Sequence, residues 1–315
     1  MSLQLGDFDR FGVVVDDLEA AMQAYARVFG IRQFDLCNIG GRQAAIGGAG
    51  SLRLELIESS GGSDVIGEFS ARRRCGMSHA VFRLAPGDTG ERLASRAAAQ
   101  QLAVETAGGR LTFASRDVLG GLALVAEAAP PVIHGQRVFD HPALLPCQKL
   151  FHVGMVVRDR ERAIDAYQRL LGIDGFLRME LHTDQGLAVW IDGVPVEHHA
   201  LTAFGRVGAF ACELMQPQGG DGLYQRFLAS HGEGPQHYFP TILAADAFAA
   251  VRDGLAAAGL GVRLEGVMGE ALRYYYLDDA PLQGMCIEVI VASGPNWWQA
   301  LGMTARDAWR IGLDV

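Results

Sequence analysis

Apolar residues along this chain alternate between short continuous runs and segments with a helical period. Residues 9–15, DRFGVVV, form one such run, which predicts a strand. The segment that starts at Asp17 places apolar side chains three or four residues apart and reaches Gly30, a residue typical of a helix C-terminus. We therefore predict an amphipathic helix whose buried face carries Ala21, Met22, Tyr25, Val28 and Phe29.

The same helix pattern returns 142 residues further along the chain, between Asp159 and Gly172. Eight positions within residues 17–31 are identical at this offset, among them Tyr25 with Tyr167. Identity at so many positions with one offset indicates an internal repeat. The later copy carries an insertion near residues 193–206, which we interpret as a surface loop that holds His198 and His199.

Strand-like runs separated by glycine follow each of these two helices. They lie at residues 32–36, 42–46 and 51–57 after the first helix, and at residues 176–181, 187–191 and 208–215 after the second. The segments that come next also resemble each other, because each has a strand, a helix and further strands. The first comprises residues 78–84, 89–101, 104, 111–114 and 122–126, and the second comprises residues 236–243, 245–258, 262, 273–277 and 285–291.

These patterns predict an α+β fold made of four βαβββ modules, arranged as two domains of two modules each. We expect an N-terminal domain at residues 1–128, a proline-containing linker at residues 129–149 and a C-terminal domain at residues 150–292. Residues 293–315 form a helical tail with several large apolar side chains, which we expect to pack over its own domain or against a second subunit of a homodimer.

Length, composition and charge narrow the class of protein. A chain of 315 residues, of which 50% are hydrophobic and 20% charged, suits a globular protein with two domains. The net charge of −9 argues against nucleic acid or an acidic membrane as a partner. We see no apolar run long enough to span a membrane and no secretory signal. The five cysteines have no metal-binding or disulfide spacing, so we expect a cytoplasmic protein that acts on a small molecule.

Two histidines and two glutamates occupy matching places in the last two modules. His152 and His237 each stand at or near the start of an apolar strand, whereas Glu213 and Glu288 each lie inside the last strand of their module. A carboxylate in a buried strand is costly unless a cation neutralises it. Two imidazoles and two carboxylates suit one divalent ion of Fe, Mn, Co, Ni or Zn per chain. The alternative is two hydrogen-bonded core histidines and two glutamates at the solvent edge.

The first two modules retain only half of this set. At the repeat offset, Arg10 stands in the place of His152, while Glu55 and His79 match Glu213 and His237. Val125 takes the place that corresponds to Glu288. We therefore expect the N-terminal domain to bind no metal and to serve as a scaffold. The same comparison favours a metal site shared by the third and fourth modules.

The module pattern and the His/Glu/His/Glu placement resemble the vicinal oxygen chelate superfamily, which includes glyoxalase I, methylmalonyl-CoA epimerase, extradiol dioxygenases and bleomycin-resistance proteins. The most specific part is residues 227–238, where FLASHGEGPQH is similar to the segment that joins the modules of the epimerases. The resemblance implies that His152, His237 and Glu288 are metal ligands. It places Glu213 where glyoxalase I has Glu and the epimerases have Gln.

The resemblance implies a metal-dependent enzyme that chelates vicinal oxygens of a small organic substrate. We expect an isomerase, epimerase or lyase that works through an enolate-like intermediate, with Glu213 or Glu288 as the base. The first alternative is an Fe(II)-dependent extradiol ring-cleaving dioxygenase that uses His152, His237 and Glu288 as its ligands. The second alternative is a non-catalytic small-molecule binding protein.

Two further sets of residues bear on these alternatives. The extradiol signature requires an acid–base histidine before the final Glu, and no histidine occurs between Tyr238 and Glu288. His182, His198 or His199 would have to replace it. An acyl-CoA substrate would require a basic rim, for which Arg178 and Arg206 are candidates.

Overall fold

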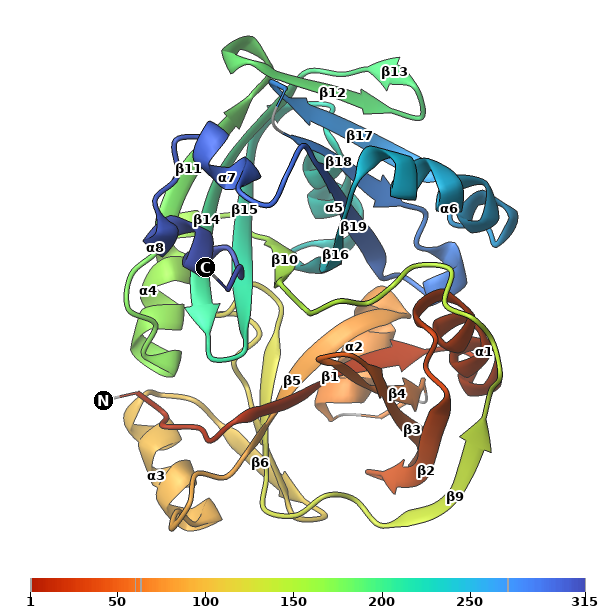
Figure 1. Ribbon diagram of the computed structural model, residues 1–315. Coiled ribbons are helices and arrows are strands. Elements are labelled where there is room, and N and C mark those ends of the chain that lie inside the picture. Colours follow the sequence, from red (N-terminus) through yellow and green to blue (C-terminus); the bar gives the residue numbers. More distant parts are fainter. Residues whose placement is uncertain (1, 60, 63, 271, 315) are drawn as a thin grey trace.

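A computed structural model describes residues 2–59, 61–62, 64–270 and 272–314 of the chain. The described part has two halves, each built on one curled sheet (Figure 1). The nine strands of the N-terminal sheet run in the order β6-β7-β8-β5-β1-β4-β3-β2-β9. The ten strands of the C-terminal sheet run in the order β11-β14-β15-β10-β16-β19-β18-β17-β12-β13. This architecture confirms the predicted α+β fold with paired modules.

The N-terminal half contains the elements that the apolar pattern predicted, together with α2. Its elements are β1 (Phe8–Val15), α1 (Leu18–Phe29), β2 (Gln33–Ile39), β3 (Arg42–Ala49), β4 (Leu52–Glu58), α2 (Val65–Arg73), β5 (Gly76–Arg83), α3 (Gly90–Ala99), β6 (Val104–Ala107), β7 (Arg110–Phe113), β8 (Ala123–Glu127) and β9 (Ile133–Val138). The last of these lies in the expected linker and pairs with β2, so the N-terminal sheet extends into residues 133–138.

The C-terminal half repeats this order with an additional hairpin, β12 and β13, which pairs with β17, and it adds the tail. Its elements are β10 (His152–Val156), α4 (Arg160–Leu171), β11 (Leu177–His182), β12 (Leu187–Ile191), β13 (Val194–Pro195), β14 (His198–Val207), β15 (Phe210–Gly220), α5 (Leu223–His231), β16 (Gly234–Leu243), α6 (Ala245–Ala257), β17 (Val262–Met268), β18 (Leu272–Leu277), β19 (Cys286–Ala292), α7 (Trp297–Ala300) and α8 (Ala305–Arg310). Short 3₁₀ turns lie at Thr183–Gln185 and Ala280–Leu282.

The two copies of the predicted helix begin and end in the same way. The carboxylate of Asp17 accepts a hydrogen bond from the backbone N–H of Ala20, and that of Asp159 accepts one from Arg162. Such a side chain satisfies an N–H group that the first helical turn leaves unpaired. Gly30 and Gly172 end the helices with φ angles of 70° and 72°, a left-handed conformation that glycine adopts without strain.

The central strands of the two sheets share one register. In the N-terminal sheet, Gly12 of β1 lies opposite Glu55 of β4 on one side and His79 of β5 on the other. In the C-terminal sheet, Gly154 of β10 lies opposite Glu213 of β15 and His237 of β16. Both antiparallel pairings contain an irregularity directly after the glycine. The correspondence of Glu55 and His79 with Glu213 and His237 therefore holds in the fold.

The helices α1 and α4 lie on opposite sides of the boundary between the two halves (Figure 1). From α1, the hydroxyl of Tyr25 lies 3.0 Å from the hydroxyl of Tyr238 in β16. From α4, the hydroxyl of Tyr167 donates to the carbonyl of Leu119 at 3.2 Å. Each helix thus places a buried tyrosine against the opposite half. One continuous hydrophobic core joins the two sheets.

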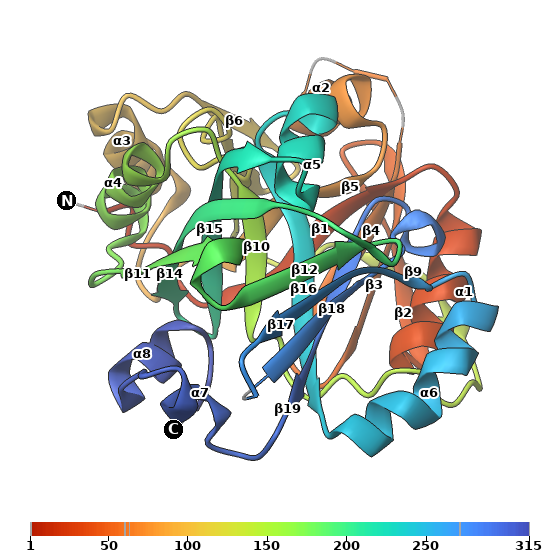
Figure 2. The same ribbon diagram turned by 90° about the horizontal axis from the view of Figure 1, so that it is seen from above.

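Two expectations about the C-terminal half are resolved by its packing. The insertion near residues 193–206 is not a surface loop, because β14 is a ten-residue strand that pairs with β11 and β15. His198 in this strand is buried. The tail packs over its own half, with Trp297 and Trp298 buried, and α8 packs against β14 (Figure 2). Within the described residues, every helix is too short or too polar to cross a membrane.

Candidate metal centre

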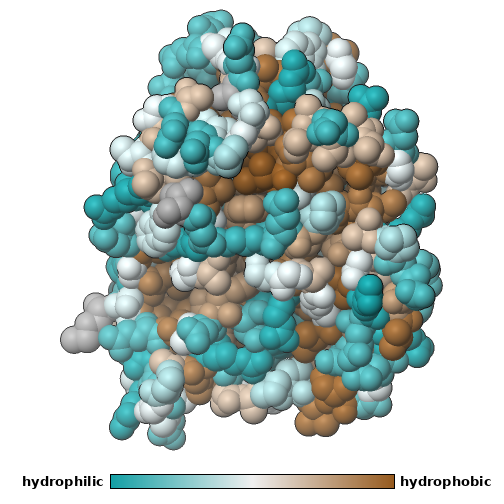
Figure 3. All heavy atoms as spheres, in the orientation of Figure 1, coloured by the Kyte–Doolittle hydropathy of each residue, from teal (hydrophilic) through white to brown (hydrophobic). Residues whose placement is uncertain are grey.

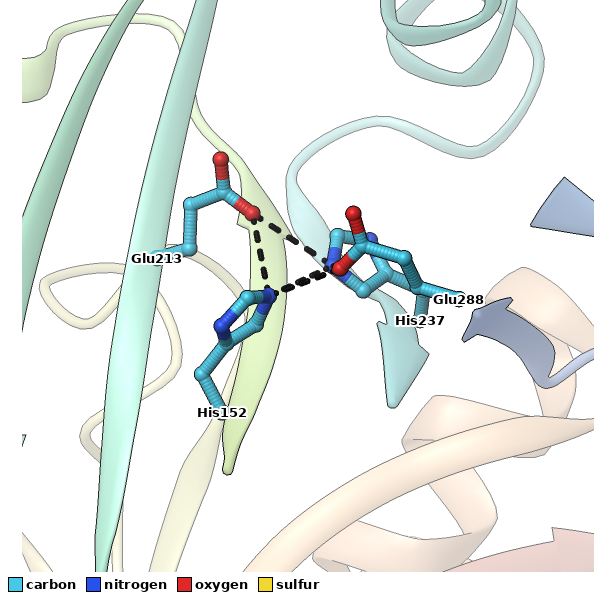
Figure 4. A group of neighbouring side chains, drawn as sticks. All are labelled: His152, Glu213, His237 and Glu288. Carbon is cyan, nitrogen blue, oxygen red and sulfur yellow. Dashed lines mark hydrogen bonds and ion pairs between the residues drawn. The ribbon is translucent and has the colours of Figure 1, made fainter. Parts of the chain in front are cut away.

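Four adjacent strands of the C-terminal sheet carry the predicted His/Glu quartet. These strands are β15, β10, β16 and β19, and they contribute Glu213, His152, His237 and Glu288 respectively. The sheet curls, so the side chains of neighbouring strands converge on one point (Figure 4). All four residues are buried, and their ligand atoms lie within 4.8 Å of one another.

The separations within the quartet match the spacing of ligands around a single ion. His152 Nε2 lies 3.0 Å from Glu288 Oε2 and 3.4 Å from Glu213 Oε2. His237 Nε2 lies 3.4 Å from each of the same two oxygens and 3.3 Å from His152 Nε2. Neighbouring ligands about 2.1 Å from one ion are about 3.0–3.4 Å apart in octahedral or tetrahedral geometry. The residues present therefore fit a divalent metal ion.

The charges of this cluster shift the pKa values of two members in opposite directions. Burial alone would lower the pKa of His237, but its contacts with Glu213 and Glu288 outweigh burial and raise the value to about 9. Burial alone would raise the pKa of Glu288, but its contacts with His152 and His237 lower the value to about 2. A positive charge is thus favoured between the carboxylates. A proton on His237 or a divalent ion would supply it.

Groups outside the quartet orient both imidazoles. His237 Nδ1 lies 2.8 Å from the side-chain oxygen of Gln236, and His152 Nδ1 lies 3.4 Å from the carbonyl oxygen of Ile311 in the tail. With Nδ1 as the hydrogen-bond donor, the Nε2 atom of each ring is left as the one that faces the cluster. In both histidines, the nitrogen that faces the cluster is therefore Nε2, the atom that would bind a metal ion.

A cavity of about 70 Å³, open to solvent on one side, lies against the quartet. Its walls include His152, Glu213 and Glu288, and the remaining lining side chains are apolar or aromatic. The sheet contributes Met179, Leu181, Phe204, Phe239, Met268, Leu272, Tyr274, Tyr276 and Ile290, α5 contributes Tyr224, and the tail contributes Trp297, Leu301, Met303 and Ile311. Figure 3 shows a hydrophobic hollow on the corresponding face of the C-terminal half.

The other sequence candidates lie outside this cavity. His198 packs edge-on against Tyr224 with ring centroids 5.1 Å apart, and His182 packs against His199. Arg178 pairs with Glu161 and Arg206 pairs with Asp314, so neither arginine forms a basic rim. The sequence patterns also missed the tail as part of the cavity wall. The apolar spacing of the tail predicts packing over the domain, and the structure extends that packing to the cavity wall.

In the N-terminal half, the guanidinium of Arg10 lies between Glu55, which corresponds to Glu213, and Glu127, which lies two residues beyond the position of Glu288. Arg10 Nε donates to Glu55 Oε2 at 2.6 Å, and another nitrogen of the same group donates to Glu127 at 2.7 Å. Glu55 also lies 2.6 Å from His79 Nε2, and Arg110 contacts Glu55 at 2.7 Å. Despite burial, these cations hold the pKa of Glu55 well below its usual range. Here the protein itself supplies the cation.

Comparisons with known proteins agree with this geometry. Residues 151–272 match the family described as the Glyoxalase/Bleomycin resistance protein/Dioxygenase superfamily. Among solved structures, the chain is similar to a triple mutant of 4-hydroxymandelate synthase from Streptomyces coelicolor, with 14% sequence identity and a TM-score of 0.64. That similarity covers 92% of this chain and 94% of the other. A search of curated proteins finds no match.

These matches confirm the resemblance to the vicinal oxygen chelate superfamily. The family match includes His152, Glu213 and His237 but ends before Glu288, and the structural match extends the shared fold to nearly the whole chain. Together they support a metal-dependent enzyme and leave its reaction class open.

We expect purified protein to contain about one divalent ion per chain, because the four candidate ligands form one site. His152→Ala or His237→Ala should each remove most of this metal, measured by elemental analysis after gel filtration. His79→Ala is the matched control in the N-terminal half and should retain the ion. Two ions per chain, or full occupancy in both site variants, would contradict the assignment.

The glycines opposite the two histidines provide a second prediction. A Cβ atom at Gly154 would lie 1.9 Å from Cε1 of His237, and one at Gly12 would lie 1.9 Å from Cε1 of His79. Each substitution to Ala should cost about 1–3 kcal/mol through overpacking. Only Gly154→Ala should also lower the metal content, because it displaces a candidate ligand. Equal metal content in the two variants would show that the position of His237 does not control binding.

The raised pKa of His237 predicts a pH dependence of the metal-free protein. Its charged form stabilises the fold fully below the ordinary value of 6.5, and this contribution is lost as the pH rises through about 9. The free energy of unfolding in urea should therefore fall between pH 6.5 and 9. Over the same range the affinity for Zn²⁺ should rise, because fewer protons compete with the ion for His237. Glu288 stays ionised across this window. His237→Gln should abolish the fall, and a wild-type stability that stays level would count against the prediction.

Proposed function

We propose that this chain is a divalent-metal-dependent enzyme of the isomerase, epimerase or lyase type, which binds a small organic substrate through two vicinal oxygens. In this proposal, His152, Glu213, His237 and Glu288 hold the ion, as their separations allow. When bound, the ion supplies a Lewis acid that stabilises negative charge on the substrate oxygens. The apolar cavity beside the quartet holds the rest of the substrate and keeps water away from it.

The observation that carries this proposal is the number of protein ligands. An octahedral ion held by four side chains has two remaining positions, which a bidentate substrate fills. Oxygen chemistry would require a further position for O₂ beside the chelated substrate. The presence of Glu213 within the same cluster as His152, His237 and Glu288 therefore favours a reaction without oxidation.

A carboxylate of the quartet can serve as the base that removes a proton from carbon. Glu213 and Glu288 both turn Oε2 toward the histidines, and Figure 4 shows the second oxygen of each on the outer side of the cluster. Both glutamates line the cavity, whereas His237 does not. Either carboxylate would face a substrate held in the cavity and could accept a proton from one of its carbons.

The alternative function is an Fe(II)-dependent extradiol dioxygenase with His152, His237 and Glu288 as its ligands. The aromatic lining of the cavity favours it, since Tyr224, Tyr276 and Phe239 would suit a ring-shaped substrate. Against it, the described cavity lining contains no histidine besides His152, so an acid–base imidazole for ring cleavage is not in place. A non-catalytic binding protein is disfavoured because it does not require a buried cluster of four metal-ligating side chains.

Two assays on the same preparations separate these reactions. Protein reconstituted with Zn²⁺, Mn²⁺ or Co²⁺ should catalyse exchange of carbon-bound protons in α-hydroxyketones with deuterium from the solvent, followed by NMR. Glu213→Gln or Glu288→Gln should slow this exchange by about 10²-fold or more, with the metal retained in the variant that lacks only the base. Oxygen uptake with catechols and hydroquinones should stay at background in the Fe(II) form. Rapid uptake there would establish the dioxygenase instead.

A further inference from the structure

The cavity beside the quartet contains no cationic side chain among its described lining residues. Apart from His152 and the two glutamates, each wall residue is Met, Leu, Ile, Phe, Tyr or Trp. The adjoining surface groove, which shares Leu181, Met268 and Leu301 with the cavity, carries Glu180 and Glu270. The described residues of that groove include no Lys or Arg, and the imidazole of His182 in the groove packs against His199. A phosphate or carboxylate outside the chelating oxygens would be buried here without a partner, at a large cost in free energy.

One polar atom in the wall has no partner within the protein. The hydroxyl of Tyr274 in β18 is buried and makes no hydrogen bond. Other buried tyrosines are satisfied, as Tyr224 and Tyr276 show by pairing their hydroxyls at 2.7 Å. Since buried hydroxyls are normally hydrogen-bonded, an unpaired one in a cavity wall indicates a donor that awaits a ligand.

The position of Tyr274 places this donor one row of side chains beyond the quartet. Tyr276 lies opposite Glu288 in the β18–β19 pairing, and Tyr274 lies opposite Ile290. Two residues along a strand correspond to about 7 Å. A hydrogen bond to Tyr274 would therefore be made by a group on the body of the substrate rather than by the oxygens at the metal.

Gly266 on the neighbouring strand makes room for this tyrosine. A Cβ atom there would lie 2.0 Å from Cζ and 2.5 Å from the hydroxyl oxygen of Tyr274. The ring thus lies directly across the glycine in β17. Burial raises the pKa of Tyr274, and the charges of Glu288 and Glu213 add to this effect, so the hydroxyl keeps its proton and acts as a donor.

We propose that the cavity takes a substrate with an uncharged, largely apolar body, on which a third oxygen, remote from the vicinal pair, accepts a hydrogen bond from Tyr274. This inference rests on the proposed function, because that function places the vicinal pair at the metal. It disfavours substrates that would carry a second anionic group into the cavity. Tyr274 is thereby the residue that selects substrates by an acceptor on their body.

Tropolones provide probes for this substrate class, because they present two adjacent oxygens on a flat ring. The Zn²⁺-loaded protein would be titrated with 4-isopropyltropolone, 4-acetyltropolone and 4-carboxytropolone, and binding followed by calorimetry. We expect the carboxylate to bind at least tenfold more weakly than the isopropyl compound. Equal or tighter binding of the carboxylate would overturn the proposed substrate class.

The acetyl and isopropyl groups have similar shapes, but only acetyl carries an acceptor oxygen. Tyr274→Phe should therefore weaken binding of the acetyl compound about fivefold and leave the affinity for the isopropyl compound unchanged. Tyr275→Phe is the matched control, because its ring stacks on Phe248 outside the cavity, and it should change neither. Equal loss for both compounds in Tyr274→Phe would make Tyr274 a packing residue and overturn its assigned role.

Stability and metal dependence separate the remaining outcomes. Since the Tyr274 hydroxyl has no partner, Tyr274→Phe should not lower the melting temperature of the protein without a ligand. A marked decrease would show that the hydroxyl serves the fold instead. If no tropolone binds more tightly to the Zn²⁺ form than to chelator-treated protein, the proposed function fails. Metal-dependent binding with the wrong order among the three compounds refutes only the substrate class.

Discussion

Burial of carboxylates inside apolar strands is the constraint on which both halves of this molecule depend. Glu55 and Glu213 lie at the same register of two similar sheets, and each requires a compensating positive charge. In the N-terminal half, the guanidinium of Arg10 forms ion pairs with Glu55 and Glu127 and supplies this charge from within the protein. In the C-terminal half, a histidine stands in the place of that arginine. The shorter imidazole leaves a gap between the carboxylates that one divalent ion fits.

The surroundings of the quartet strengthen its electrostatics. The apolar walls of the cavity lower the local dielectric constant, so the carboxylate of Glu288 interacts with nearby positive charge more strongly than it would in water. The tail contributes to the same effect, because Trp297 and Leu301 cover the cavity and the carbonyl of Ile311 lies beside the ring of His152. A segment outside the repeated modules therefore helps both to enclose the site and to orient one candidate ligand.

Sequence patterns alone located much of this arrangement. The helices that begin after Asp17 and Asp159, and the quartet of His152, Glu213, His237 and Glu288, follow from local periodicity and position within the repeat. The interpretation of His198 as part of a loop was wrong, because pairing of β14 with two other strands buries it. Such pairing depends on segments distant in sequence, as does the contact of the tail with the cavity. The apolar spacing of the tail predicts that it packs, but not which surface it covers.

Two tyrosines that make hydrogen bonds across the boundary between the halves affect how the chain folds. Tyr25 and Tyr167 each belong to one half but reach their hydroxyl partners in the other. Neither sheet can therefore complete its interior before the opposite sheet is present, and the two halves should gain and lose structure in a single cooperative transition. The N-terminal half, in which Arg10 lies between Glu55 and Glu127, thus completes the interior of the half with the quartet. The half with the quartet is not an independently excisable unit.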